Sequence, residues 1–245
     1  MNEVMKTLTN HRSIRSYTNE PVSEEQLNQI IAAAQAAPSS INGQQITIIS
    51  IQDPEKKAKA TEYVGNQPWV AQAPVFLIFC ADFYRAKIAA EKNGQPLGIT
   101  DGVESLLVGA TDVGLAMGNA IAAAESMGLG IVPIGGVRKD PQKLIELLGI
   151  PEYVFPVCGL VVGHPADLSA KKPRFMSEAI HHRESYNKEQ KPFVDAYDDT
   201  ISAYMKERTD GKEDRTWSSA IAGFYKGIYA PNVQPTILKQ GFKLK

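Results

Sequence analysis

The sequence has little of the residue types that most often mark a metal or redox centre. Its 245 residues include two cysteines and four histidines. Cys80 and Cys158 lie inside apolar runs, which favours buried reduced thiols over a disulfide. His181 and His182 are adjacent, but no ligand spacing links them to the other two histidines. We therefore expect neither a disulfide nor a metal site.

Common nucleotide-binding signatures and a one-sided charge are also missing. The chain contains neither GxGxxG nor GxxxxGK[ST], which counts against a Rossmann dinucleotide site and against a P-loop. The 26 basic side chains are balanced by 27 acidic ones. Because this balance gives no global field for nucleic acid or an anionic membrane, any charge-based chemistry must come from local clusters.

Neither a targeting segment nor a membrane span is expected. Residues 1 to 10 include an acidic residue and no long apolar core, unlike a signal or transit peptide. The apolar run over residues 102 to 127 contains Glu104, Asp112 and Glu125, and carboxylates are costly inside a bilayer. We expect a cytoplasmic protein in which this run is a buried helix. Its small residues would allow another helix to approach closely, so the run also suits a subunit interface.

Helix and strand signals predict one α+β domain over residues 1–245, with a helical C-terminal extension at about 190–245. Capping motifs predict helix starts at Ser23, Asp53 and Asp140. The apolar runs ITIISI, PVFLIFCAD, GLGIVPI and YVFPVCGLVVG predict buried strands. Three further helices are expected, at residues 2 to 8 with Val4, Met5 and Leu8 inward, at 193 to 206, and at 217 to about 239.

A basic heptapeptide, HRSIRSY at residues 11 to 17, concentrates hydrogen-bond donors without any carboxylate. Arginine offers a planar fork of donors, and serine and histidine offer single ones. This composition suits a phosphate-binding segment, although a solvated basic loop has the same composition. A second basic segment, KKPR at residues 171 to 174, is either solvated or the other half of the same anion site.

Three short segments carry neutral groups that can face a ligand. PSSINGQQ at residues 38 to 45 offers hydroxyls and amides between a helix and a strand, a position equally typical of a simple connection. GNQPW places Trp69 beside two amides, where the ring is either core or a ligand wall. Gly135 and Gly136 expose backbone amides against which a flat ligand can lie, a weak signal alone.

Five segments, HRSIRSY, APSSINGQQ, GNQPW, AAESMGLGIVPIGGVR and KKPR, occur in the order and approximate spacing of the FMN-dependent nitroreductase family. The chain most resembles the branch of NADPH-dependent nitro and flavin reductases, over about residues 5 to 243. The resemblance implies a nitroreductase-like fold, with a mixed central sheet surrounded by helices. It also implies a homodimer with FMN at the subunit interface, in which the GFKLK tail is exchanged with the partner's sheet.

The resemblance assigns cofactor contacts but no catalytic side chain, because the flavin carries the chemistry. Arg15 could face the ring, where reduced flavin gains negative charge. The other basic residues, with Ser13, suit the phosphate, and the two glycines would leave room for the ring. The FMN contacts implied in this way are His11, Arg12, Ser13, Arg15, Ser39, Ser40, Gln67, Ile134, Gly135, Gly136, Lys172 and Arg174.

The implied activity is hydride transfer from NAD(P)H through bound FMN to nitroaromatics, quinones or flavins, in a substituted-enzyme cycle. Two alternatives stay open: an NAD(P)H:FMN reductase that uses flavin as a diffusing substrate, and a non-catalytic flavin-binding module. The family's contact with the NADPH phosphate falls on Arg208, but Glu213 and Asp214 follow it here. Since two carboxylates weaken recognition of a 2'-phosphate, NADH is also an expected donor.

Overall fold

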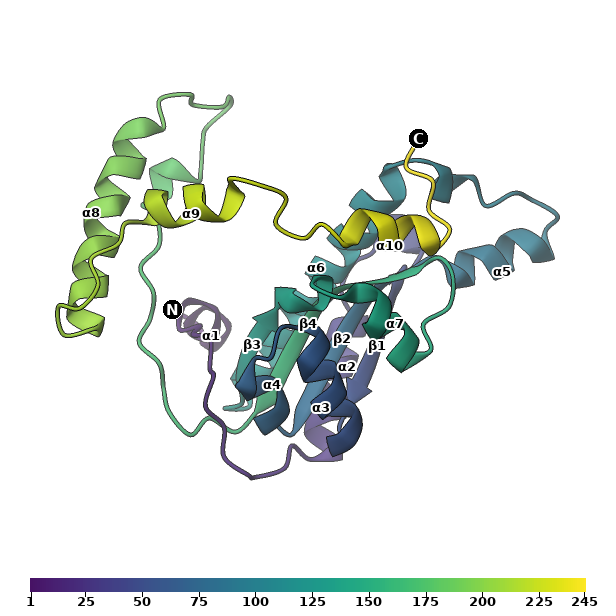
Figure 1. Cartoon of the computed structure of the whole chain (residues 1–245), viewed down its shortest axis with the longest axis horizontal. Coiled ribbons are helices and arrows are strands. Elements are labelled where there is room, and N and C mark those ends of the chain that lie inside the picture. Colours follow the sequence, from purple (N-terminus) through teal and green to yellow (C-terminus); the bar gives the residue numbers. More distant parts are fainter. The chain divides into compact units, whose positions relative to one another are not determined.

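The computed structural model describes residues 1–245, which form two compact units. Unit 1 comprises Met1–Ser169 and Ala230–Lys245, and unit 2 comprises Ala170–Tyr229. The single domain expected from the sequence therefore stays a prediction. The elements, shown in Figure 1, are α1 (Glu3–Thr9), α2 (Glu24–Gln35), η1 (Ser40–Asn42), β1 (Ile46–Ile51), α3 (Pro54–Tyr63), α4 (Pro68–Gln72), β2 (Val75–Asp82), α5 (Tyr84–Lys92), η2 (Gly98–Asp101), α6 (Glu104–Ser126), β3 (Gly130–Ile134), η3 (Gly135–Arg138), α7 (Pro141–Leu148), β4 (Val154–Gly163), η4 (Ser177–Ala179), α8 (Lys191–Arg208), α9 (Trp217–Tyr225) and α10 (Val233–Lys239).

Unit 1 is built on a four-stranded sheet with the order β1-β2-β4-β3. All three neighbouring pairs are antiparallel, and the parallel pairing in the chain is limited to an isolated bridge between Ser13 and Ile131. The expected mixed sheet is thus antiparallel in all its strands. The connections from β1 to β2 and from β3 to β4 each begin and finish at one end of the sheet, which antiparallel pairing permits.

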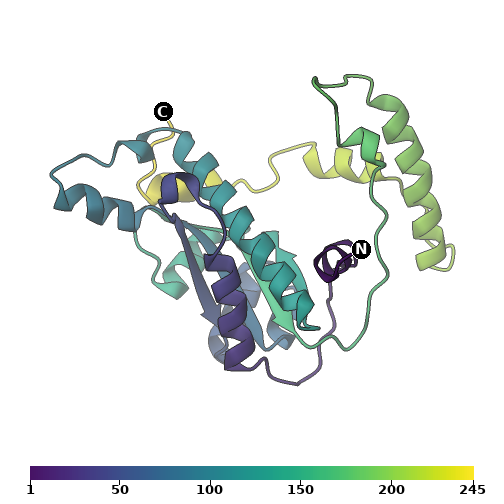
Figure 2. The same ribbon diagram turned by 180° about the vertical axis from the view of Figure 1, so that it is seen from behind.

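Helices cover both faces of this sheet. α3, α4 and α7 lie on the face seen in Figure 1, and α2 and α6 lie on the opposite face, seen in Figure 2. Side chains of β2 alternate between the two cores, with Phe76 and Ile78 in one and Leu77 and Phe79 in the other. Every residue of β2 is buried, as expected for a strand that reads as a continuous apolar run.

The predicted strands and capped helix starts are confirmed. Ser23 and Gln26 form a reciprocal capping box, so α2 begins where the sequence indicated. Asp53 and Asp140 each accept a hydrogen bond from the backbone N–H three residues later. These caps fix the starts of α3 and α7, which contact each other on the face of the sheet seen in Figure 1.

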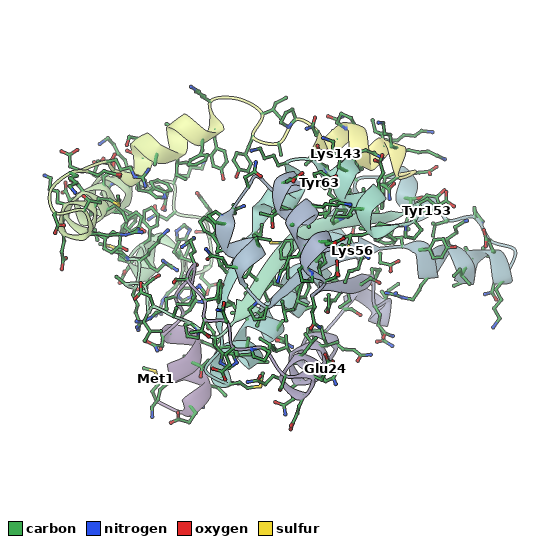
Figure 3. All side chains as sticks on the ribbon, turned by 60° about the horizontal axis from the view of Figure 1, so that its bottom comes forward. Met1, Glu24, Lys56, Tyr63, Lys143 and Tyr153 are labelled. Carbon is green, nitrogen blue, oxygen red and sulfur yellow. The ribbon has the colours of Figure 1, made fainter.

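α3 is less exposed than its many charges suggested. Figure 3 shows Lys143 of α7 beside Tyr63 of α3, with the ammonium 5.6 Å from the ring centroid. Lys57 is buried, and its Nζ donates to the carbonyl of Ala73 at 2.5 Å. Burial lowers the pKa of Lys57. This lysine therefore fastens α3 to the end of α4 instead of facing solvent.

Two helices expose apolar residues that the sequence analysis placed inside. In α1, Val4, Met5 and Leu8 are all exposed, because α1 packs mainly against α6 and leaves most of its surface open. α6 is long and apolar enough by composition to cross a membrane, yet it packs against α2 and the sheet, as a core helix does. Its outer face still exposes Leu107 and Leu115, so it is buried on one side only.

The C-terminal region departs from the helix predicted for it. The helix expected over residues 217 to 239 is broken into α9 and α10, because Pro231 lies in the break and the two helices belong to different units. Exchange of the tail with a partner's sheet stays a prediction. Lys243 and Lys245 donate backbone N–H groups to Thr100 and Asp101 of the same chain, and burial of Phe242 in the core anchors the tail there.

Unit 2 contains η4, α8 and α9. Aromatic rings hold it together, with the Phe175 and Tyr197 centroids 4.0 Å apart and those of Phe175 and Trp217 4.9 Å apart. Asp198 of α8 accepts hydrogen bonds from the backbone N–H and the hydroxyl of Ser218 in α9. Unit 2 is thus stabilised by a small cluster of aromatic rings, whereas unit 1 has an extended hydrophobic core.

Candidate functional site

The basic heptapeptide lies along the edge of the sheet. The N–H of Ile14 donates to the carbonyl of Ile131 in β3 at 2.9 Å, and Tyr17 forms a bridge with Pro165 just beyond β4. Ile14 is buried, whereas Arg15 and Ser16 are exposed. The segment therefore has the fixed, extended backbone of a sheet edge, which distinguishes it from a solvated loop.

β3 is shaped to receive this segment. It is an edge strand, so Pro133 is tolerated within it despite lacking an N–H donor. A Cβ atom at Gly130 would lie 2.8 Å from Cγ1 of Ile14, closer than side chains pack. Glycine at position 130 thus lets Ile14 enter the core. Insertion of Ile14 in turn orients Ser13 and Arg15 away from the core.

His11 is oriented by a carboxylate that the sequence analysis did not assign to the site. Its Nδ1 lies 2.7 Å from Oε1 of Glu125, near the end of α6. Since Glu125 engages Nδ1, the other ring nitrogen, Nε2, remains for another partner. Glu125 was noted only as an argument against a membrane span. An isolated acidic residue in an apolar helix was the signal that could have identified it.

Two buried donors beside the heptapeptide have no partner in the protein. They are Nε of Arg12, whose Nη2 donates to Asn10, and Nε1 of Trp69. The Arg15 guanidinium lies 5.5 Å from the centroid of the Trp69 ring. Buried donors are rarely left unpaired, so this region is built for a ligand with acceptor atoms. Trp69 packs against the core, and its Nε1 is left available to a ligand.

Gly136 lies next to Gln67. The sequence analysis expected a glycine here to leave room for the flavin ring, but the structure shows close packing against the chain itself. A Cβ at Gly136 would lie 2.1 Å from the Val64 carbonyl oxygen and 2.7 Å from Nε2 of Gln67. The space that the sequence analysis reserved for a ligand ring at this position is thus filled by the chain's own loop. Gly135 differs, because its Cβ would meet only the end of the Arg138 side chain at 3.3 Å. Ile134 precedes the pair at the end of β3 and is buried.

Ser39 and Ser40 are not brought to the heptapeptide of the same chain. The N–H of Ser40 donates to Oδ1 of Asp112 at 3.1 Å, and Ser39 accepts from the N–H of Gln44. Asp112 and the Glu125 that binds His11 are thirteen residues apart on α6 (125 − 112). At the rise of an α-helix they are separated by about 20 Å. Within one chain, these serines and His11 therefore contact well-separated parts of α6.

The second basic segment belongs to unit 2. Arg174 donates to the carbonyls of Lys172 and Pro173, which coils the segment on itself. Tyr197 donates its hydroxyl hydrogen to the Pro173 carbonyl at 2.9 Å, so α8 carries the segment. Burial raises the pKa of Tyr197, with Arg174 opposing the shift. Arg208 ends the same helix.

Clustered metal ligands and cysteine thiols are two other features that can form a site. The structure contains no group of three or more His, Cys, Asp or Glu side chains that could hold a metal ion. Cys80 and Cys158 are free thiols, and burial raises the pKa of both. The expectation of no disulfide between them is confirmed.

Comparison with known proteins identifies the family of this chain. Residues 8–164 match the model of the nitroreductase family, and residues 172–245 match that of the nitroreductase family C-terminal domain. The chain is 60% identical to an FMN reductase [NAD(P)H] of Bacillus subtilis, covering 100% of both chains, and 42% identical to an FMN reductase (NADPH) of the same organism, covering 99% of both. It superimposes on the structure of Bacillus megaterium NfrA2 with a TM-score of 0.99 and 61% identity, covering 100% of both chains. The chain therefore belongs to the nitroreductase family.

Proposed function

We propose that this chain is an NAD(P)H-dependent oxidoreductase that holds FMN beside the heptapeptide and reduces nitroaromatics, quinones or flavins. The observation that carries the proposal is the pair of buried donors without protein partners, Nε of Arg12 and Nε1 of Trp69, next to the Arg15 guanidinium. FMN supplies phosphate and ring oxygens that would accept these hydrogen bonds. The residues present therefore fit the cofactor that the family uses.

Each side chain has a defined task around that cofactor. FMN, when bound, takes up a hydride from a nicotinamide donor and passes the electrons to an acceptor. Arg12 and Ser13 bind the phosphate, and Nε2 of His11 is available to the ligand because Glu125 holds Nδ1. Arg15, fixed over Trp69, provides positive charge at the ring, where reduction adds electron density. Gln67 is held beside the ring region by its hydrogen bond to Val64 and its packing on Gly136.

The active form is a homodimer. Two features support this proposal. Leu107 and Leu115 expose apolar surface on α6, which a second copy would cover. Ser39 and Ser40 lie about 20 Å along α6 from the His11 contact, so the serines that meet a given FMN come from the other copy. Lys172 and Arg174 stay predicted contacts of the FMN phosphate.

The nicotinamide donor is NADPH, with NADH as a usable substitute. Arg208 at the end of α8 provides the positive charge for a 2'-phosphate. Arg215 pairs with Glu213 at 3.4 Å, which reduces the charge available in the loop after α8. The proposed location is the cytoplasm, where both donors are present, and neither nucleic acid nor a membrane is a partner.

The purified protein tests this proposal directly. Flavin absorbance at about 450 nm should survive gel filtration and bleach when NADPH is added under nitrogen. An Arg15→Met variant should keep its flavin but be reduced more slowly, because the charge near the ring is lost. A colourless protein that gains no reductase activity from added FMN would refute the proposal, and persistent colour after NADPH would indicate a flavin-binding module.

The alternative of a flavin reductase is favoured by the names of the two B. subtilis relatives. In this version FMN is also a substrate that leaves in its reduced form. Loss of the yellow colour on gel filtration, combined with steady turnover of added FMN, would support it. Retained colour with turnover of nitroaromatics would support the bound-cofactor version.

A further inference from the structure

The loop from Ser39 to Gln44 has a backbone conformation that must be imposed from outside. Ile41, Asn42 and Gln44 have φ values of 50°, 55° and 52°, in the left-handed region that non-glycine residues rarely adopt. Ile41 is also 94% exposed, so packing of its side chain does not hold it there. Such a conformation persists only when surrounding contacts determine it.

Support from below the loop is limited. A cavity of about 460 Å³ lies between α2, β1 and α6, and Ser39, Asn42 and Gln44 form part of its wall. Within the loop, the N–H of Gly43 donates to the Ser40 carbonyl at 2.8 Å, which shapes the turn but does not attach it to the fold. The attachments at the two ends therefore decide where the loop sits.

At its first end, the loop is attached to α6. The buried carboxylate of Asp112 accepts the Ser40 N–H at 3.1 Å. At its second end, the loop is attached to α5 by one side chain, Arg85. Its Nη2 donates to the carbonyl of Gln44 at 2.8 Å and to that of Ile46.

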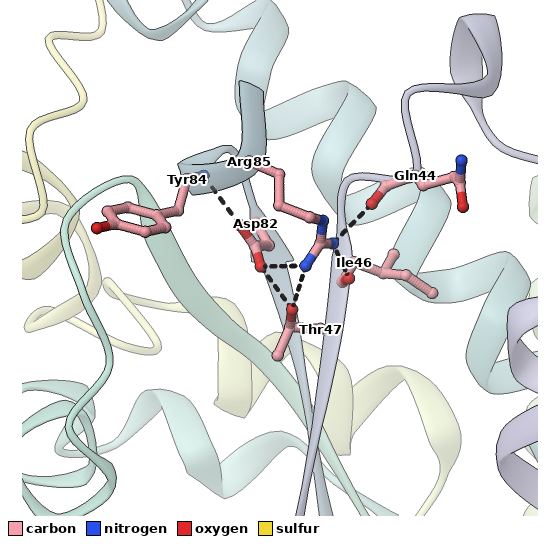
Figure 4. Close-up of polar contacts among 6 residues, drawn as sticks. All are labelled: Gln44, Ile46, Thr47, Asp82, Tyr84 and Arg85. Carbon is pink, nitrogen blue, oxygen red and sulfur yellow. Dashed lines mark hydrogen bonds and ion pairs between the residues drawn. The ribbon is translucent and has the colours of Figure 1, made fainter. Parts of the chain in front are cut away.

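Figure 4 shows that Arg85 is itself held from the other side. Its Nη1 donates to Oδ2 of Asp82 and to Oγ1 of Thr47, both at 3.0 Å. Asp82 is buried at the end of β2, and its Oδ1 accepts the Tyr84 N–H at the start of α5. The guanidinium thus joins β1, β2 and α5 to the end of the loop. A lysine could not do this, since its ammonium lacks the planar fork.

We propose that Arg85 is a positioning residue for flavin binding, which holds the Ser39–Gln44 loop in its strained conformation so that Ser39 and Ser40 face the cofactor. The assignment rests on the proposed function, because it takes these two serines as FMN contacts. In this assignment Arg85 acts through the loop and not through contact with the reacting atoms. Without it, only a fraction of molecules hold the competent loop, and the apparent dissociation constant of FMN rises by the inverse of that fraction.

The test compares Arg85→Met with Arg85→Lys and with Lys87→Met. Lys87 is a matched control, because it lies on the same helix and forms ion pairs with Glu91 and Glu152 at the surface. In the flavin-free full chain, Arg85→Met should speed amide hydrogen exchange at Gly43 and Gln44 about tenfold, since the loop opens more often. Its FMN dissociation constant should rise about tenfold, while kcat at saturating FMN stays within about twofold. Arg85→Lys should recover part of both losses, and Lys87→Met should match the wild type.

The outcomes separate this inference from the proposed function. A wild-type chain that binds no FMN would overturn the proposed function and the flavin role of Arg85 together. A wild type that binds FMN, with Arg85→Met binding it equally well or Lys87→Met losing as much, would overturn only the assignment to Arg85. A fall in thermal stability of Arg85→Met without any change in loop exchange or FMN affinity would assign Arg85 a purely structural role, which also contradicts the proposal.

Discussion

The two basic segments of this chain use the same side-chain chemistry on very different supports. In unit 1 the heptapeptide is hydrogen-bonded to β3 through its backbone, and Ile14 is inserted into the core. In unit 2 the Lys172–Arg174 segment depends on the Tyr197 hydroxyl and on an aromatic cluster. A segment built into a sheet edge has little freedom left to lose on binding, whereas one carried by two helices has more. We expect unit 1 to provide most of the cofactor affinity and unit 2 to adjust it.

The largest effect is expected in unit 1, where a substitution at Gly136 tests how tightly the chain packs around this residue. Gly136→Ala should lower the free energy of unfolding by about 3 kcal/mol and abolish FMN retention, because its Cβ would collide with the Val64 carbonyl. Gly135→Ala is the matched control and should cost less than about 1 kcal/mol, since a flexible arginine can move aside. Urea unfolding of both variants measures this difference. Equal stabilities would show that the loop at Val64 yields easily.

The direct comparison of the two units replaces one arginine from each. Arg12→Ala should raise the FMN dissociation constant about 100-fold, because a half-buried guanidinium with an unpaired Nε loses charge-assisted bonds to the cofactor. Arg174→Ala should raise it about tenfold, because this exposed side chain already donates to the carbonyls of the two preceding residues. Titration of apoprotein with FMN, followed by flavin fluorescence, gives both constants. A larger effect for Arg174 would reverse the proposed ranking of the two units.

Stability at alkaline pH should depend on Tyr17, which fixes the end of the heptapeptide. Its buried hydroxyl donates to the Ile14 carbonyl at 2.7 Å, and burial raises its pKa above the usual 10.0. The folded chain thus holds this proton more tightly than the unfolded chain does. The resulting stability is complete below about pH 10 and is lost as the pH rises above that value.

Tyr17→Phe isolates this contribution. The variant should lose about 1 kcal/mol at neutral pH, through the missing hydrogen bond, and should show a shallower loss of stability between about pH 9.5 and about 11 than the wild type. Urea unfolding at several pH values measures both quantities. Parallel curves for the two proteins would contradict the assignment of the shift to Tyr17.

The smallest effect is expected at Tyr197, which holds the Lys172–Arg174 segment of unit 2 in place. Tyr197→Phe keeps the stacked ring but removes the bond to the Pro173 carbonyl, so FMN affinity should fall about threefold. Tyr204→Phe, on the same helix, is the control and should leave affinity unchanged. Equilibrium titration with FMN compares the variants. If Tyr197→Phe costs as much as Arg12→Ala, the unit 2 segment is as rigidly organised as the heptapeptide.

Local sequence signals were sufficient for most of the elements. The cap residues Ser23, Asp53 and Asp140 predicted helix starts because side-chain caps act within three residues. The apolar run around Phe76 predicted a strand because each of its neighbours is apolar, whichever face it meets. Pro231 interrupted a helix that apolar spacing alone had extended.

The sequence by itself determined which residues are candidates for the site, since a cluster of arginine, serine and histidine without carboxylates is visible in seven letters. Only the tertiary structure decided how they are held. The pairing of Glu125 with His11, the filling of the Gly136 space by Val64 and the anchoring of Gln44 by Arg85 each join residues at least 41 positions apart. Contacts of that range leave no periodic or local pattern, because they depend on how strands and helices pack and not on the residues beside them.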